Sequence, residues 1–399
     1  MKRICAALLA LGLGCAPVYA RGVTLKTVST FAGGDAAAYT YTELLKTWQE
    51  ATGHTVNDRS ASSDEDWKTS VLKDFAAGNE ADVLFFFTRT AESASILSKV
   101  VPIAEINAAY PDACLPRNEA LAEADGRVYA IPVRPFWEGL FCNADLFEAY
   151  DLELPTTWDR LVIAVETFRK NGIVPISVSL SDVPHYIAEF CILSCGSVED
   201  FRRRPARGEP VPQSWVEGMR LIHTLYEMGA FAQNVSATTE AAASQLFREK
   251  KAAMQIDGSW FANSLSGESM ASTVVIPFPA YSREADPTAY LYGVSMGFYL
   301  TRSAWRTPEV RDAAVDLLCF LCTGKNARAL GVYDLSGRLM QSYETMVEGA
   351  AEKCTPIQDD MRPAARGKWF AALPGIADGS VDPEALWREI MEMDPFSKP

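Results

Sequence analysis

Asp82-Val83-Leu84-Phe85-Phe86-Phe87 is a short run in which every residue after the aspartate is apolar. A run of this length without polar alternation is typical of a strand that is buried on both faces, as in the middle of a parallel sheet. The preceding residues 66–77 place apolar side chains on one helical face, and Gly78 follows them as a stop signal. This stretch therefore predicts a helix that leads directly into a central strand.

The same alternation of helices and strands continues on both sides of this run. Upstream, residues 23–30 alternate like a strand, residues 39–52 have helical spacing, and a weaker strand begins at residue 55. This order of elements predicts an α/β fold. Downstream, strands are predicted near 126–133, 140–143, 252–256 and 274–279, and helices over 145–150, from 155, and over 184–195, 214–228, 245–250 and 308–323.

Length and charge limit the class of protein further. The chain has 399 residues, which is too many for one compact core, so two lobes are predicted. Its formal net charge of −14 becomes −16 once Lys2 and Arg3 are removed with the first 20 residues. An acidic surface repels nucleic acid, and no basic stripe compensates for it, so nucleic acid is excluded as a partner.

The N-terminus has the features of an export signal. Lys2 and Arg3 precede the apolar segment 4–13, which is too short to span a bilayer. The segment Val18-Tyr19-Ala20 resembles a signal-peptidase site and predicts a mature chain that starts at Arg21. We therefore expect residues 1–20 to be a signal peptide and the protein to be exported to the periplasm or the cell surface.

A second route of export is lipidation. Gly14-Cys15 resembles the end of a lipobox, which would leave Cys15 as a lipid-bearing N-terminus, but Gly12 stands where leucine is usual. We favour cleavage after Ala20 because small residues precede that site. No later apolar stretch approaches 18 residues, so no membrane-spanning helix is predicted beyond the signal.

The cysteines suggest packing rather than chemistry. Cys319 and Cys322 have the spacing of a redox or metal pair, but they lie in the apolar helical run 313–322, where free cysteine behaves as a small hydrophobic residue. A zinc site would need further ligands, and the chain has only three histidines. We therefore expect buried thiols, no metal and no cofactor. Seven cysteines follow residue 20, an odd number that leaves at least one unpaired: Cys114, Cys142, Cys191, Cys195, Cys319, Cys322 and Cys354.

Several short blocks of sequence follow one another in a characteristic order along the chain. They are 75–83 (FAAGNEADV), 125–133 (DGRVYAIPV), 139–147 (GLFCNADLF), 154–159 (LPTTWD), 247–254 (FREKKAAM) with 257–260 (DGSW), and the segment around Gly293 with the helix from residue 308. Each block is weak alone, but in their order and spacing they resemble the extracellular solute-binding proteins of carbohydrate ABC importers, the group that includes the maltose-binding protein. Cys142, where the family often has a bulkier residue, and an Arg- and Pro-rich loop at 202–212, expected to be solvated, depart from the pattern.

The resemblance implies a periplasmic-binding-protein-like fold of two α/β lobes, joined by a hinge that the chain crosses about three times. The ligand is then expected between the lobes, near the C-terminal ends of strands. The expected crossings are 133–135, 275–277 and 331–334. They divide the chain into a first lobe, 21–133 with 278–332, and a second lobe, 136–275 with 335–399.

A sugar hydroxyl forms hydrogen bonds with carboxylates and amides, and the C–H face of a sugar packs on a flat aromatic ring. We therefore expect both residue types on the loops that follow the strands. In the first lobe, Asp35 follows the glycines of the first loop, and it could equally cap the next helix. Glu65, beside Asp64, follows the second strand, where a solvated helix N-terminus is the favoured alternative. Thr88 ends the buried strand and is expected to face the ligand.

The second lobe supplies most of the aromatic candidates. Trp137 and Glu138 follow the first crossing, where Trp137 could instead be packing. For His185 a structural role is the favoured alternative. The resemblance implies that an aromatic residue after the Asp-Gly motif, here Trp260, stacks on the sugar. The other candidates are Tyr186, Glu189, Tyr292 and Met296.

These features predict a binding protein rather than an enzyme. A glycosidase needs two carboxylates at a controlled separation, but no nucleophile elbow, P-loop or zinc-protease motif is present. Arg134 is the one basic candidate near the hinge, which favours a neutral mono- or oligosaccharide. The expected partners are that carbohydrate and the permease subunits of an ABC transporter, and the expected state is a monomer. The alternatives are a binding protein that serves a membrane sensor and, less favoured, a carbohydrate-active enzyme.

Overall fold

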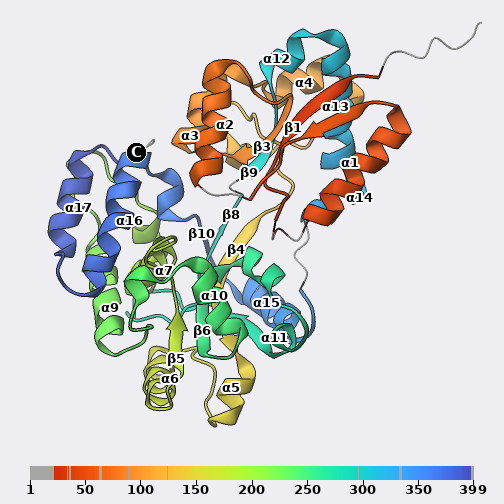
Figure 1. Ribbon diagram of the computed structural model, residues 1–399. Coiled ribbons are helices and arrows are strands. Elements are labelled where there is room, and N and C mark those ends of the chain that lie inside the picture. The colour runs from red at the N-terminus through yellow and green to blue at the C-terminus, as the bar shows by residue number, and fades with distance from the viewer. Residues whose placement is uncertain are drawn as a thin grey trace, which may run out of the picture.

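The computed structural model describes residues 22–396, apart from residues 34, 36, 63, 64, 89, 124, 295 and 332–334. The predicted signal peptide, residues 1–20, and the alternative lipidation site at Cys15 lie outside the described residues. Two lobes, each built on its own sheet, are stacked along the long axis of the molecule (Figure 1). The predicted two-lobe α/β architecture is confirmed.

The first lobe contains a four-stranded sheet in the order β2-β1-β3-β9. Strands β1 (Thr24–Val28), β2 (Thr55–Asp58) and β3 (Val83–Phe87) are parallel, and β9 (Met296–Leu300) is antiparallel to β3. Its helices are α1 (Ala38–Thr52), α2 (Glu65–Ala77), α3 (Ala91–Ile96), α4 (Ile103–Ala109), α12 (Arg302–Arg306), α13 (Pro308–Cys322) and α14 (Gly324–Gly331).

The run that ends in three phenylalanines forms β3, as its composition predicts. Phe85 packs into one core with residues of α1 and α13, whereas Leu84 and Phe86 pack into a second core against α2. Successive side chains of a strand point to opposite faces, so covering both faces of this sheet requires an uninterrupted apolar run. The sequence shows no alternation here because neither face of β3 meets water.

The second lobe contains a six-stranded sheet in the order β10-β8-β4-β6-β5, with β7 also paired to β4. The long strand β4 is antiparallel to β6, β7 and β8. The strands are β4 (Phe136–Asn143), β5 (Val174–Ser177), β6 (Ala252–Gly258), β7 (Thr273–Ile276), β8 (Tyr290–Gly293) and β10 (Lys353–Cys354). The helices are α5 (Ala144–Ala149), α6 (Trp158–Lys170), α7 (His185–Cys195), α8 (Val198–Arg202), α9 (Gln213–Glu227), α10 (Glu240–Arg248), α11 (Gly267–Ser272), α15 (Gly337–Gly349), α16 (Pro363–Ala377) and α17 (Pro383–Glu392).

The C-terminal helices complete the core of the second lobe. Trp369 of α16 and Trp387 of α17 lie 5.2 Å apart between ring centroids, and Trp387 lies 5.1 Å from Trp215 of α9. All three indoles are almost fully buried. The segment beyond residue 340, whose sequence resembles the family little, is therefore an integral part of this lobe.

Most residues of the segment 202–212 are exposed, as the sequence predicts. Arg204 is an exception, because its side chain is only 11% exposed and its Nε lies 2.9 Å from Asp360 Oδ2. Its guanidinium also donates to the carbonyl of Phe201. A charge this buried needs a partner, and here the pair attaches the loop to the C-terminal segment.

The sheets show where the chain passes between the lobes. Ile131 bridges to Phe298 of the first sheet and Phe136 begins β4 of the second, so the chain passes from one sheet to the other between these two residues. The second crossing differs from the expected 275–277. Because β8 pairs with β4 and β9 pairs with β3, the chain leaves the second sheet only after Gly293. Residues 278–293 therefore pack with the second lobe rather than the first.

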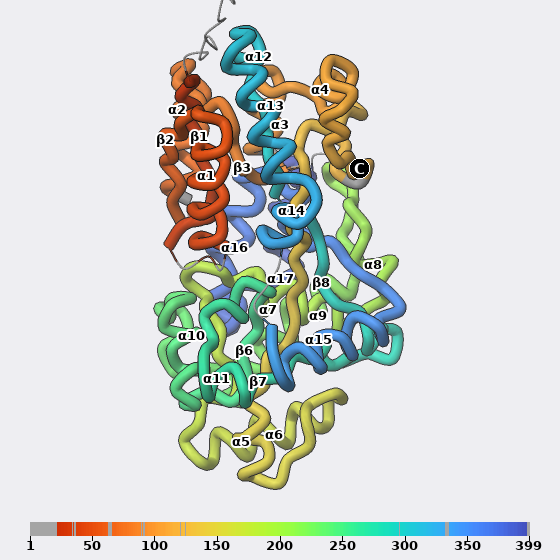
Figure 2. The backbone as a smooth tube through the Cα atoms, turned by 90° about the vertical axis from the view of Figure 1, so that its right-hand side faces the viewer, coloured from red at the N-terminus to blue at the C-terminus, as the bar shows by residue number. Residues whose placement is uncertain are grey.

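The third expected crossing, 331–334, lies almost wholly outside the described residues. Its two flanks belong to different lobes, since Leu330 packs into the first-lobe core and Leu339 of α15 packs against the second sheet. Viewed from the side, α14 lies in the upper lobe and α15 in the lower lobe (Figure 2). Within the described part of the chain, no helix is long and apolar enough to cross a membrane.

Candidate functional site

Five aromatic side chains of the second lobe form a contiguous group, which we call the aromatic group. The Trp260 ring centroid lies 5.8 Å from that of Tyr186 and 6.0 Å from that of Phe136. His185 continues the group, with its ring 4.5 Å from Tyr186 and stacked on Phe370 at 4.6 Å with an interplanar angle of 5°. The predicted residues His185, Tyr186 and Trp260 are therefore neighbours, although they come from α7 and from the turn after β6.

Gly258 explains the position of Trp260. Strand β6 ends at Gly258, and the short 3-10 helix Ser259–Ser264 follows it, so the strand changes to a helical turn directly after the Asp-Gly motif. A Cβ atom at residue 258 would lie only 2.2 Å from Cη2 of the Trp260 indole. The indole therefore rests directly on the glycine backbone, and only a residue without a side chain allows this approach.

Three carboxyl groups are buried in the same region: Glu138 on β4, Glu189 on α7 and Asp257 on β6. They are 3%, 0% and 2% exposed, respectively. Glu189 Oε1 accepts a hydrogen bond from the backbone N–H of Gln358 at 2.8 Å, and Asp257 Oδ1 accepts one from that of Gly258 at 2.7 Å. Among the described residues, Oε2 of Glu138 and Oε2 of Glu189 have no hydrogen-bond partner.

Burial holds protons on these carboxyl groups. Desolvation, followed by the nearby Glu189, raises the pKa of Glu138 well above its ordinary value. Desolvation likewise raises the pKa of Glu189 to about 8 and that of Asp257 to about 8. At neutral pH these groups are largely neutral acids, which can both donate and accept hydrogen bonds.

Trp137 belongs to the core rather than to the aromatic group. It is 2% exposed, it stacks on Phe141 at 5.7 Å, and it contacts Tyr343 of α15 at 4.8 Å. Adjacent residues of β4 point to opposite faces of the sheet, so Trp137 and Glu138 cannot both face the aromatic group. The structure supports the packing alternative for Trp137 and places Glu138 on the side of α7.

The two candidates near the second crossing also lie apart from the aromatic group. Tyr292 is paired in register with Trp137, and its ring lies 4.9 Å from Lys353 Nζ. Met296 begins β9, opposite Phe87 in the first sheet. Both side chains are half-buried beside the passage between the lobes.

Two of the first-lobe candidates, Asp35 and Thr88, contact residues of the segments that connect the lobes. Asp35 Oδ2 lies 2.7 Å from Arg134 Nη2, and its Oδ1 accepts a hydrogen bond from the N–H of Ala37 at 2.8 Å. Asp35 thus both caps the chain before α1 and neutralises the basic hinge residue. Thr88 is 4% exposed and donates to the carbonyl of Val294 at 3.1 Å, which attaches β3 to the second crossing. Asp64 and the side chain of Glu65 lie outside the described residues.

The C-terminal helix α16 brings two further residues to this region. Phe370 supplies the ring on which His185 stacks, and Arg366, one turn earlier, contacts Glu92 of the first lobe. Burial lowers the pKa of His185 to about 3, and the charges of Arg366 and Lys68 act in the same direction. Sequence reasoning missed both α16 residues because no local motif marks them. Their role depends on contacts with segments far away in the chain.

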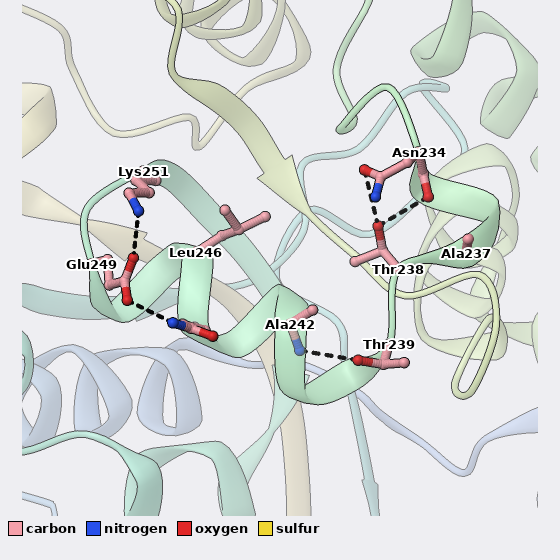
Figure 3. A pocket seen from close by; sticks show the side chains of 9 residues that line it. Asn234, Ala237, Thr238, Thr239, Ala242, Leu246, Glu249 and Lys251 are labelled. Atoms are coloured by element: carbon pink, nitrogen blue, oxygen red, sulfur yellow. Dashed lines mark hydrogen bonds and ion pairs between the residues drawn. The ribbon is translucent and has the colours of Figure 1, made fainter.

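A separate hollow of about 380 Å³ lies along α10 (Figure 3). Glu249 Oε2 lies 2.7 Å from Lys251 Nζ, and Glu249 Oε1 accepts a hydrogen bond from Gln245 Nε2 at 2.7 Å. None of the predicted site residues lines this hollow, and we assign it no ligand. In the described ranges of the chain, no group of three or more His, Cys, Asp or Glu side chains is disposed to hold a metal ion.

The fold and this region define a two-lobed binding protein. Residues 33–321 match the family model for the bacterial extracellular solute-binding protein, and the chain belongs to that family. No curated protein sequence matches the chain.

Solved structures show the same fold at low sequence identity. A chitin oligosaccharide binding protein has a TM-score of 0.78 at 18% identity, covering 93% of this chain and 98% of its own. A structure from a study of xylan utilization by Caldanaerobius polysaccharolyticus has a TM-score of 0.76 at 20% identity, covering 93% and 100%. The maltose/maltodextrin-binding domain MalE from Bdellovibrio bacteriovorus, bound to maltotriose, has a TM-score of 0.68 at 16% identity, covering 93% and 98%.

Proposed function

We propose that this protein captures a carbohydrate between its two lobes and delivers it to the permease subunits of an ABC importer. The observation that carries the proposal is the aromatic group around Trp260, set beside the buried carboxyl groups of Glu138, Glu189 and Asp257. Structures of the same fold described as bound to raffinose, stachyose and maltotriose support a carbohydrate as the ligand class.

The chemistry of the region suits a neutral sugar. Aromatic rings pack on the C–H faces of a sugar, and protonated carboxyl groups can donate to and accept from its hydroxyls. Arg134, the basic residue near the hinge, is neutralised by Asp35, so it does not require a negatively charged ligand as its partner. The ligand-binding set that we propose is Asp35, Glu65, Thr88, Glu138, His185, Tyr186, Glu189, Trp260, Tyr292 and Met296, with Phe136 and Phe370 included because their rings contact Trp260 and His185. Trp137 is removed from it.

Binding between lobes also provides the signal to a transporter. A ligand shifts an equilibrium between open and closed forms only if it binds the closed form better, which requires contacts from both lobes. The first lobe approaches the second-lobe site through Arg134, Asp35 and the Glu92–Arg366 ion pair. We propose that the protein acts as a monomer, and that it is exported by cleavage after Ala20 rather than by lipidation at Cys15.

We further propose that the protein binds its ligand without chemical turnover. Incubation with any sugar that binds, followed by chromatography of the products, tests this. Unchanged sugar is the expected result, and hydrolysis would favour a carbohydrate-active enzyme instead.

A thermal-shift screen against neutral mono- and oligosaccharides tests the binding role, because a ligand of the native state raises the melting temperature by mass action. We expect at least one sugar to stabilise the protein and calorimetry to give one site. A screen in which no carbohydrate shifts the melting temperature would overturn the proposal. Loss of sugar uptake after deletion of the gene would support delivery to a transporter, whereas intact uptake with loss of a sugar-induced response would favour a sensor partner.

A further inference from the structure

The seven cysteines of the described chain fall into two classes. Five are buried, with exposed fractions between 0% and 8%: Cys142, Cys191, Cys195, Cys322 and Cys354. Cys114 is exposed and Cys319 is half-buried. The sequence expectation of buried thiols therefore holds for Cys322 but not for Cys319.

The two accessible cysteines are neighbours in the first lobe. Cys319 Sγ, on α13, lies 3.8 Å from the carbonyl oxygen of Ala113, the residue bonded to Cys114. A carbonyl oxygen and the next Cα are about 3 Å apart across a trans peptide, so the Cα of Cys114 lies within about 7 Å of the Cys319 sulfur. Cys114 is also among the groups whose charge raises the pKa of Cys319, after burial and Asp316.

The cysteine pairs within single helices cannot form disulfides. Cys191 and Cys195 are four residues apart on α7, and Cys319 and Cys322 are three apart on α13. Such helical neighbours have Cβ atoms roughly 5–6 Å apart, whereas a disulfide needs about 3.8 Å. Bridging either pair would require unwinding a buried helix.

We propose that Cys114 and Cys319 form a disulfide in the exported protein and that the five buried cysteines remain thiols. The chain belongs to a family of extracellular proteins, and disulfides form and persist outside the reducing cytosol. The bond connects the turn after the 3-10 helix Pro111–Ala113 to α13, both within the first lobe. It therefore does not restrain movement between the lobes.

The bond forms by thiol–disulfide exchange with an external disulfide, such as that of a disulfide-donating oxidoreductase. The exposed Cys114 thiolate attacks one donor sulfur and the other donor sulfur leaves as a thiolate. The Cys319 thiolate then attacks the Cys114 sulfur of the mixed disulfide and releases the second donor sulfur. The two cysteines are oxidised, the donor disulfide is reduced to two thiols, and the two cysteine protons pass to the donor sulfurs through solvent. Cys319 reacts second because burial raises the pKa of its thiol. Cys114 must rotate away from the Pro111 carbonyl, which its Sγ contacts at 3.0 Å.

The test uses the full mature protein secreted into an oxidising compartment. It is denatured in the presence of an alkylating reagent without reductant, and its intact mass and peptides are measured. We expect five alkylated cysteines beyond residue 20 and one peptide pair linked through Cys114 and Cys319. The Cys114→Ser and Cys319→Ser variants should each show six alkylated cysteines, and the control Cys322→Ala should keep the linked pair. Seven alkylated cysteines in the unsubstituted protein, or Cys114 linked to any other cysteine, would overturn the proposal.

A second measurement does not depend on identifying the cross-linked peptides. Because the cross-link closes a loop of about 200 residues, reduction should lower the melting temperature by about 5 °C. The same reduction should leave the melting temperature of Cys114→Ser unchanged and should not alter the affinity for any sugar that binds. An equal response of both proteins to reductant would contradict the assignment.

Discussion

Arg366 Nη2 lies 2.7 Å from Glu92 Oε1, and this ion pair joins α16 of the second lobe to α3 of the first. The two side chains are only 12% and 11% exposed. Burial opposes the ionisation of Glu92, but the Arg366 charge and the hydrogen bonds from Arg366, Thr90 and the backbone together outweigh it and lower the pKa of that carboxyl. In Figure 1, α3 lies at the edge of the first lobe nearest the C-terminal helices α16 and α17. The ion pair therefore bridges the two lobes on this side of the molecule.

Replacing Glu92 by Gln should open the molecule and weaken ligand binding. A charged hydrogen bond of this kind contributes roughly 1.5–3 kcal/mol, which corresponds to about a tenfold to hundredfold loss in affinity if the pair forms only in the closed state. Small-angle scattering should show a larger radius of gyration for the variant, and calorimetry the weaker binding.

The exposed pair of Lys170 and Glu166 is the matched control, since it lies within α6 and its side chains are more than half exposed. Glu166→Gln should change neither measurement. If Glu92→Gln behaved like this control, the Glu92–Arg366 pair would have no role in closure.

Trp260→Ala should weaken sugar binding without unfolding the protein. Loss of the indole removes a hydrophobic contact of roughly 1–3 kcal/mol, about a tenfold to hundredfold change in dissociation constant. Calorimetric titration and circular dichroism measure the two effects separately. A folded Trp260→Ala protein with unchanged affinity would place this residue in packing instead.

Trp137→Ala should instead lower the stability of the protein, in contrast to Trp260→Ala, which should lower its affinity for sugar. Trp137 is 2% exposed in the core beneath β4, so the substitution should reduce the free energy of unfolding by about 3–5 kcal/mol. Denaturant melts measure this loss. A stability equal to that of the unsubstituted protein would show that Trp137 is not part of the core.

Gly258→Ala should displace the Trp260 indole. The added methyl group would lie 2.2 Å from the ring, while the backbone φ of −101° suits alanine. The fold should therefore persist, the tryptophan fluorescence should change, and affinity should fall at least tenfold. Gly349→Ala is the control, because no heavy atom lies within 4 Å of its added Cβ. Equal affinities of both variants would argue against a ligand role for this turn.

The contribution of Glu189 to the stability of the protein should decrease between pH 5 and pH 9, whereas His185, whose pKa burial lowers to about 3, acts in the opposite direction below about pH 6.5. Glu189 has a folded-state pKa of about 8, above the ordinary value of 4.5. The folded state therefore binds this proton more tightly than the unfolded state. Its stabilising contribution is complete below pH 4.5 and is lost as the pH rises through about 8. The expected loss is on the order of a few kcal/mol for this group.

Urea melts at pH 5, 7 and 9 test this, with Glu189→Gln as the informative variant. The glutamine amide can still accept the hydrogen bond from Gln358, but it does not titrate, so the variant should lose less stability with rising pH. The exposed Glu344→Gln should follow the unsubstituted protein. Parallel pH profiles for the Glu189→Gln and unsubstituted proteins would mean that Glu189 is not the titrating group.

Much of the fold is predictable from local pattern. The apolar run of β3, the helices of the first lobe, and the glycines that end α1 and α2 with positive φ angles of 73° and 76° all follow from periodicity and stop signals. These features depend on residues within a turn or two of one another. For the same reason the Asp-Gly motif before Trp260 marked a turn at a strand end.

Local sequence patterns therefore predict the class of fold and the order of its elements, and they propose one anchor of the candidate site. Three further features follow from tertiary contacts: Trp137 and Glu138 face opposite sides of β4, β8 belongs to the second sheet, and α16 supplies Phe370 and Arg366. These outcomes depend on strand register and on contacts between residues far apart in the chain. Such contacts form when whole faces of helices and sheets are buried together, and no short window of sequence contains both partners.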